Sequence, residues 1–155
     1  PTFLAWHPTG KLLGGRPDGT VVSWEASGKG PAVVSRHHRA AVRAWAASAA
    51  TWDFATGDDA GVVGVWADKA LQPTTVPVCG AAVAYLAFSP SGAELAAADA
   101  AGGIWVGGVA AGTFAPLAKR PGLNALAYGP TDDLLLLAAG RAVELWHVTG
   151  LAAAP

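Results

Sequence analysis

The 155-residue chain contains no methionine and one cysteine, Cys79, and only 14% of its residues are charged. A single cysteine cannot form a disulfide within the chain, which is typical of reducing compartments and favours a cytoplasmic location. No apolar run reaches the roughly 18 residues that a membrane-spanning helix requires. Ten basic and eleven acidic residues give a net charge of -1, so we expect neither nucleic acid nor a membrane as a partner.

Tryptophan, in contrast, is abundant and recurs at a nearly constant interval. Trp24, Trp66, Trp105 and Trp146 are separated by 42, 39 and 41 residues. An aromatic residue also precedes each of them by the length of one hairpin, and these four aromatic residues are Trp6, Trp45, Phe88 and Tyr128. A repeat of this period indicates one supersecondary unit copied in tandem.

Turns and short apolar runs alternate within each copy. Proline and glycine mark a turn at His7-Pro8-Thr9-Gly10, and similar turns follow at Ser89-Pro90-Ser91-Gly92 and Gly129-Pro130-Thr131-Asp132. Runs such as Val62-Val63-Gly64-Val65-Trp66 are rich in the branched and aromatic side chains that suit strands. No window keeps the three-and-four spacing of apolar residues that a helix needs. The sequence therefore predicts an all-β protein.

Three or four strands in every forty residues are typical of a propeller blade. The chain resembles the WD-repeat β-propeller family over essentially its whole length, through the segments 3–24, 41–66, 82–105 and 123–146. The aspartate that usually follows the marker tryptophan is replaced by Glu25, Ala67, Val106 and His147, and the family's Gly-His pair survives only as His38. The resemblance implies about four blades over 1–155, with repeats at 1–37, 38–78, 79–120 and 121–155.

Four blades fit poorly with ring closure, because propellers of this family are usually larger and an open ring leaves strand edges bare. The chain also lacks an initiator methionine, and its fourth copy ends at residues 151–155, where the outermost strand of that copy should begin. We therefore expect a partial propeller, roughly half of one, from a longer polypeptide.

The most polar cluster is Arg36-His37-His38-Arg39. Adjacent histidines on an extended backbone point in opposite directions, and flanking arginines repel a cation, so we expect no metal here but a loop with one structural histidine. Arg36, His37 and Arg39 are instead candidates for binding the acidic groups of a partner protein. Trp52 has no place in the repeat, and two interpretations stay open for it: an exposed aromatic anchor, or a buried replacement for a missing turn proline.

The remaining chemistry-bearing residues favour structural roles. The paired carboxylates Asp58-Asp59 and Asp132-Asp133 fit turns whose carboxylates cap backbone amides or meet water. Cys79 lies in an apolar stretch without an adjacent base, unlike a reactive thiol. No nucleophile elbow or phosphate loop occurs, and nothing ionisable repeats on the predicted inner strands, so we assign no catalytic residue, metal, cofactor or small-molecule substrate.

The sequence thus favours a non-enzymatic scaffold that binds other subunits of a larger assembly. Segments 4–9, 19–24 and 38–45, and segment 56–58 together with 61–66, are similar to the N-terminal propeller of a large subunit of intraflagellar transport complex A, which implies a role in retrograde ciliary transport and cargo entry. Other ciliary or dynein-associated WD-repeat scaffolds, a ubiquitin ligase substrate receptor and a propeller-type enzyme are the alternatives.

Overall fold

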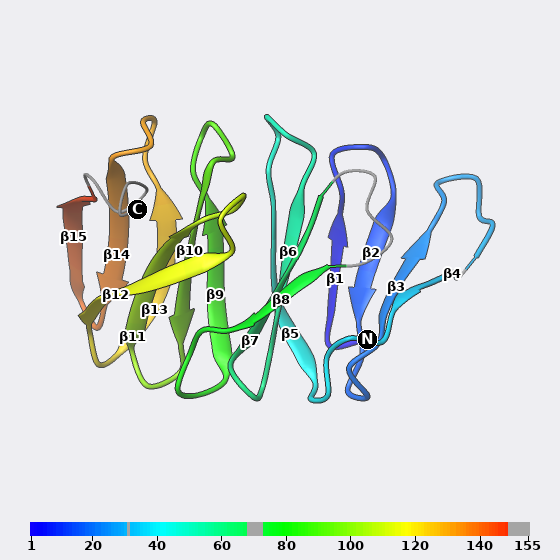
Figure 1. Ribbon diagram of the computed structural model, residues 1–155, viewed down its shortest axis with the longest axis horizontal. Coiled ribbons are helices and arrows are strands. Elements are labelled where there is room, and N and C mark those ends of the chain that lie inside the picture. The colour runs from blue at the N-terminus through cyan, green and yellow to red at the C-terminus, as the bar shows by residue number, and fades with distance from the viewer. Residues whose placement is uncertain (31, 68–72, 149–155) are drawn as a thin grey trace.

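A computed structural model describes residues 1–30, 32–67 and 73–148 of the chain (Figure 1). These residues form fifteen strands joined by turns, and none of them lies in a helix. The all-β prediction is confirmed.

The strands form four antiparallel sheets, and within each sheet strands that follow one another in the chain pair with one another. We call the sheets blades 1 to 4. Blade 1 contains β1 (Phe3–Trp6), β2 (Leu12–Gly15), β3 (Val21–Trp24) and β4 (Ala32–Ser35). Blade 2 contains β5 (Val42–Ala47), β6 (Phe54–Asp58), β7 (Val62–Trp66) and β8 (Thr74–Pro77). Blade 3 contains β9 (Val83–Phe88), β10 (Glu94–Asp99), β11 (Gly103–Gly108) and β12 (Thr113–Lys119). Blade 4 contains β13 (Leu123–Tyr128), β14 (Leu134–Ala139) and β15 (Ala142–His147).

The blades stand side by side in an open row, with blades 1 and 4 at opposite ends (Figure 1). A closed four-bladed ring is not formed, in agreement with the predicted partial propeller. The expected outermost strand of the fourth copy, at residues 151–155, lies outside the described residues.

Apolar side chains between adjacent blades hold the row together. Val21 of blade 1 packs with Val42 and Trp66 of blade 2. A second cluster joins blade 2 to blade 3 and includes Val63, Val65, Val83 and Leu95, and a third joins blade 3 to blade 4 and includes Ile104, Val106, Leu135 and Leu137. Because side chains alternate between the two faces of a strand, each inner blade buries both faces, one against each neighbour.

Strand pairing corrects two of the predicted repeat markers. Trp24, Trp66 and Trp146 pair with Leu12, Phe54 and Leu135, which are the equivalent residues of β2, β6 and β14. In blade 3 the equivalent pair is Leu95 with Gly107, so Trp105 lies two residues before the marker position, although on the same face. The structure thus places three of the four tryptophans at corresponding points.

A similar shift affects the first column of aromatic residues. Trp6, Phe88 and Tyr128 each end the first strand of their blade, as predicted. In blade 2 that position is occupied by Ala47, and Trp45 lies two residues earlier. Trp45 still contacts blade 1, where its ring is stacked on that of Phe3 with the ring centroids 6.4 Å apart. A tryptophan placed two residues away faces the same side of the sheet, so it meets the same neighbouring blade and the sequence spacing alone does not reveal the shift.

Candidate functional site

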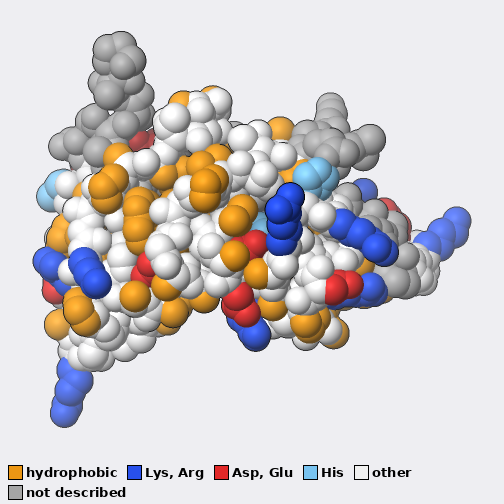
Figure 2. Space-filling model, turned by 60° about the horizontal axis from the view of Figure 1, so that its bottom comes forward, with side chains coloured by type: hydrophobic (Ala, Val, Ile, Leu, Met, Phe, Trp, Pro, Cys, Tyr) orange, Lys and Arg blue, Asp and Glu red, His pale blue; other side chains and the backbone are white. Residues whose placement is uncertain are grey.

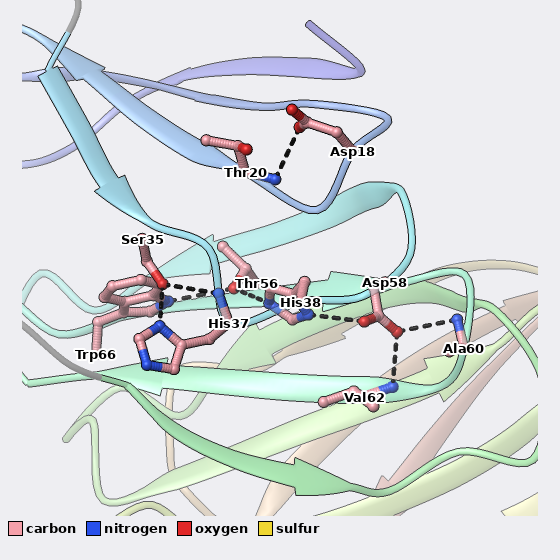
Figure 3. Close-up of polar contacts among 10 residues, drawn as sticks. All are labelled: Asp18, Thr20, Ser35, His37, His38, Thr56, Asp58, Ala60, Val62 and Trp66. Carbon is pink, nitrogen blue, oxygen red and sulfur yellow. Dashed lines mark hydrogen bonds and ion pairs between the residues drawn. The ribbon is translucent and has the colours of Figure 1, made fainter.

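A buried chain of hydrogen bonds runs through blade 2 (Figure 3). The Nδ1 atom of His38 lies 2.9 Å from Oδ2 of Asp58, and its Nε2 atom lies 2.8 Å from Oγ1 of Thr56. The indole Nε1 of Trp66 donates to the same Thr56 hydroxyl at 3.2 Å. The other oxygen of Asp58 accepts the amides of Ala60 and Val62, each at 2.9 Å.

The hydrogen-bond roles in this network follow from its donors. A carboxylate only accepts, so Nδ1 of His38 carries a proton, and the Thr56 hydroxyl, which receives the indole proton, donates its own to Nε2. Every polar atom is then satisfied, in accord with the absence of unpaired buried side-chain polar atoms among the described residues.

Threonine, histidine and aspartate are thus connected in the order of a catalytic triad. The side chains of His38 and Asp58 are 0% exposed, however, and Thr56 is also 0% exposed, so no substrate can reach the hydroxyl. The network is therefore structural: it fixes the link between blades 1 and 2 to the turn between β6 and β7. This finding agrees with the prediction of one structural histidine in the cluster.

The equivalent places in blades 3 and 4 hold different residues. In each of the first three blades, a turn glycine packs against the backbone carbonyl of one residue in the link to the next blade. The glycines are Gly19, Gly61 and Gly102, and the link residues that they contact are His38, Cys79 and Arg120, which are therefore equivalent to one another. Burial, and secondarily the charge of Asp99, raises the pKa of the Cys79 thiol to about 12, which keeps it protonated and unreactive as the sequence indicated.

Blade 4 substitutes a salt bridge for the histidine network. Nε of Arg120 donates to Oε2 of Glu144 at 3.0 Å, and Nε1 of Trp146 donates to the same oxygen at 2.8 Å. The guanidinium also lies 4.5 Å from the centre of the Trp146 ring. Sequence analysis missed both networks. The feature that could have revealed them is a polar residue near each of these marker tryptophans, since Thr56 lies ten residues before Trp66 and Glu144 lies two residues before Trp146.

The exposed candidates lie on the link between β4 and β5. Arg36, His37 and Arg39 are all exposed, whereas His38 between them is buried. Ser35 shares a hydrogen bond with Nδ1 of His37, and the His37 ring meets Trp66 edge-on at 6.5 Å. Neither Arg36 nor Arg39 forms an ion pair with a described residue, so both guanidinium groups remain available to a partner.

Charge separates between the two ends of the blades. We call the end that carries the β2–β3, β6–β7, β10–β11 and β14–β15 turns and the links between blades the basic end; it is at the bottom of Figure 1 and comes forward in Figure 2, where blue side chains spread across it. Its basic residues are Arg16, Arg36, Arg39, Arg43, Lys119, Arg120 and Arg141. Its acidic residues are Asp18, Asp58, Asp59, Asp99 and Glu144, of which Asp58 and Asp99 are buried.

The opposite end has the reverse balance, and we call it the acidic end. Its described charged residues are Lys11, Lys29, Glu25, Asp53, Glu94, Asp132 and Asp133. A chain with almost no net charge therefore presents two faces of opposite sign, a feature that composition alone conceals.

Trp52 belongs to the acidic end, in the turn between β5 and β6, and so does not share a surface with Arg36 and Arg39. It is 44% exposed and has a φ of 62°, the only positive φ of a non-glycine residue among those described. It takes the place that Gly10 takes in blade 1, rather than that of a turn proline, and its carbonyl accepts a hydrogen bond from Nε2 of His7 at 3.0 Å. Its main-chain role is thus to join the turns of blades 1 and 2.

Asp59, Asp132 and Asp133 lie in turns, as predicted, whereas Asp58 is the last residue of β6 and caps the amides of the turn that follows. Asp59 forms an ion pair with Arg43 at 2.8 Å, and Asp132 accepts the amide of Ser91 in the neighbouring blade at 2.9 Å. No group of three or more potential metal ligands occurs within the described residues, and no helix there is long and apolar enough to cross a membrane.

Comparisons with known proteins address the fold. No family model matches the sequence, and no curated protein matches it. A chain in the crystal structure of a mitotic checkpoint complex superposes with a TM-score of 0.77 at 18% sequence identity, over 96% of this chain and 48% of that one. The fold is that of a WD-repeat β-propeller. The chain spans about half the length of the chain that it matches, so this similarity describes the fold alone.

Proposed function

We propose that the chain is a non-catalytic scaffold whose basic end binds an acidic segment of a partner protein. The observation that carries this proposal is the separation of charge between the two ends of the blades. Arg36 and Arg39 are exposed at the basic end and form no ion pair with any residue that the structure describes. Opposite charges across an interface steer the approach of a partner and fix its orientation, and loops on a rigid scaffold commonly carry such sites.

An octaglutamate peptide labelled with a fluorophore tests this proposal by fluorescence anisotropy. We expect binding at low salt that weakens at about 0.3 M salt, because exposed charges are then screened. The variant Arg36→Glu/Arg39→Glu replaces two attractive contacts with repulsive ones and should weaken binding about tenfold, on the scale of exposed ion pairs. Both positions are exposed, so the variant should keep the wild-type melting temperature.

The matched control is Lys11→Glu/Lys29→Glu, which makes the same charge change at the acidic end. This variant should bind the peptide about as well as the wild type does. Equal losses in the two variants would mean that net charge, and not the basic end, determines binding, and would refute the proposal.

Intraflagellar transport complex A is the assembly that we put forward first, with a cytoplasmic and ciliary location. Its support is the sequence similarity of segments 4–9, 19–24 and 38–45, and of 56–58 together with 61–66, which correspond to β1, β3, the start of blade 2 and the two strands of the β6–β7 hairpin. Co-precipitation with the other subunits of that complex, reduced by Arg36→Glu/Arg39→Glu, is the expected result. A dynein-associated scaffold and a ubiquitin ligase receptor predict capture of different subunits in the same experiment.

A further inference from the structure

The backbone of Trp52 is strained in a way that the fold itself does not require. Its φ of 62° lies in the left-handed region, where a Cβ atom costs free energy and glycine does not. Gly10 takes the same place in blade 1 and has a φ of 84°. The carbonyl of Trp52 accepts a hydrogen bond from His7, but the carbonyl of a glycine would do so equally well. The indole side chain is therefore the cause of the strain and not a remedy for it.

The indole ring of Trp52 also contributes little to the interior of the protein. The residue is 44% exposed. Its ring is not stacked on any other aromatic ring among the described residues, and its Nε1 atom donates no hydrogen bond to them. A strained backbone that presents an exposed tryptophan, with no gain for the fold, points to a function for the side chain.

A groove of about 490 Å³ lies beside Trp52, between blades 2 and 3 at the acidic end. Thr51 and Asp53, the chain neighbours of Trp52 on either side, both line it. Its walls are mostly small and apolar, and they include Val65 and Ala67 from blade 2 and Ala93 and Val109 from blade 3. Walls of this kind suit the aliphatic part of a long side chain.

The surface around the groove is negatively charged. The described residues of the acidic end include five acidic and two basic side chains, and both basic ones, Lys11 and Lys29, belong to blade 1. Lys11 is paired with Glu25 in the same blade. In blades 2 to 4, the described part of this end thus carries carboxylates and no lysine or arginine. Side-chain hydrogen bonds lower the pKa of Asp132 and Asp133 below the usual 3.8, so both are ionised at neutral pH.

We propose that this surface binds an arginine-rich segment of a partner protein, with one guanidinium group stacked on Trp52 and the aliphatic stem of a neighbouring arginine in the groove. Tryptophan attracts a cation more strongly than the other aromatic rings do, and the planar guanidinium group stacks on such a ring. The methylene groups of arginine pack on apolar walls while its charged end stays in water. Charge complementarity favours this occupant over an acidic or a purely apolar one.

The proposed surface is separate from the one that we assign to acidic partners. The acidic end, at the top of Figure 1, lies opposite the basic end that carries Arg36 and Arg39. A scaffold with both surfaces holds an acidic and a basic partner at the same time. The inference rests on the conformation and exposure of Trp52, on the groove and on the charge around it, and it does not depend on binding at the basic end.

Fluorescence anisotropy with labelled octaarginine at low salt tests the role of Trp52. We expect Trp52→Gly to weaken binding about fivefold, on the scale of one exposed cation–π contact. The same variant should keep or raise the melting temperature, because glycine relieves the strain at this φ. Trp52→Phe retains an aromatic ring and should lose less affinity. Ala50→Gly is the matched control, since it places a glycine in the same turn and keeps Trp52, and it should bind as the wild type does.

A second pair of variants tests the groove. Ala93→Lys places a cation at an exposed position of the groove wall and should also weaken octaarginine binding about fivefold. Its control is Ala101→Lys, the same change at an exposed alanine in the β10–β11 turn of the basic end, which should leave binding unchanged. Octalysine carries the same charge as octaarginine but has no planar group to stack, so it should bind the wild type more weakly.

Equal binding of octaarginine by the wild type and by Trp52→Gly would overturn the inference, because diffuse charge alone would then attract the peptide. A clear fall in the melting temperature of Trp52→Gly would also overturn it, since the ring would then serve the fold. Equal losses in Ala93→Lys and Ala101→Lys would remove the groove from the site and the proposal with it. Arg36→Glu/Arg39→Glu should keep full octaarginine binding, so a failure at one end of the blades is distinguishable from a failure at the other.

Discussion

At the scale of single residues, the position of His38 shows how one side chain can join two blades. His38 comes from the link between blades 1 and 2, yet both of its ring nitrogens bond to residues of β6. Replacing it by alanine leaves the Asp58 carboxylate and the Thr56 hydroxyl buried with fewer partners. We expect His38→Ala to lower the free energy of unfolding by about 3 kcal/mol, the usual cost of breaking a buried charged hydrogen-bonded pair.

Urea denaturation measures this loss, and Arg39→Ala is the matched control one residue away. Arg39 is exposed and makes no ion pair with a described residue, so its loss should change stability by no more than about 0.5 kcal/mol. If His38→Ala proved as harmless as the control, the network would not be what holds the link in place.

The residues also show where sequence reasoning succeeds and where it stops. The opposite orientations of His37, which is exposed, and His38, which is buried, agree with the extended-backbone geometry from which one structural histidine was predicted. The hydrogen-bond partners of that histidine could not be predicted, because Thr56 and Asp58 are 18 and 20 residues away in the chain and reach it only through the tertiary fold. The exposed anchor role of Trp52 stays a prediction; its positive φ depends on a turn one residue longer than its counterpart in blade 1.

At the scale of elements, Gly57 on β6 controls how closely blades 2 and 3 approach. A Cβ atom there would lie 2.6 Å from Cβ of Val83 on β9, and one methyl group of Val83 is closer still. We expect Gly57→Ala to cost about 1–3 kcal/mol, the range for overpacked interiors. The free energy of unfolding from urea titration is again the measurement.

Two further variants isolate the steric cause. Gly80→Ala is the control, since a Cβ atom there meets nothing within 4 Å and the residue has no positive φ. Adding Val83→Ala to Gly57→Ala should restore part of the lost stability, because it removes the methyl groups that clash. A double variant as unstable as the sum of the single ones would assign the cost to the strand and not to the contact between blades.

Strand periodicity was sufficient to predict the elements but not their register. The runs that end at Trp24, Trp66 and Trp146 form β3, β7 and β15, as their composition indicated. Trp105 was misplaced by two residues because a shift of two keeps a side chain on the same face, so its burial pattern resembles that of a correctly placed marker. Only the pairing of Leu95 with Gly107 resolves the difference.

At the scale of the whole molecule, carboxylates tie the blades together and make stability depend on pH. Asp132 of blade 4 accepts a hydrogen bond from the amide of Ser91 in blade 3. Glu144 of blade 4 accepts one from Arg120 in the link that precedes this blade. The Ser91 hydrogen bonds lower the pKa of Asp132 below its usual 3.8, and the Arg120 hydrogen bond lowers the pKa of Glu144 below 4.5. Hydrogen bonds to Thr20 and Thr131 lower the pKa of Asp18 and Asp133 as well.

These shifts fix the direction of the pH dependence. A carboxyl group whose pKa is lower in the folded protein binds fewer protons there than in the unfolded chain, so its stabilisation is complete above the unfolded pKa. It is lost as the pH falls through the folded value. Since the usual values are 3.8 for aspartate and 4.5 for glutamate, urea midpoints should stay constant near neutral pH and fall as the solution is acidified below these values.

Asp132→Asn tests whether the contact between blades contributes to this slope. Its amide oxygen can still accept the Ser91 amide proton, but it does not titrate, so the variant should lose less stability between neutral and acid pH than the wild type does. Glu25→Gln serves as the control, because it neutralises an exposed carboxylate at the same end of the blades whose ion pair, with Lys11, lies within blade 1. Acid slopes that are identical in Asp132→Asn and the wild type would show that the pairing of Asp132 with Ser91 adds nothing to the cohesion of blades 3 and 4.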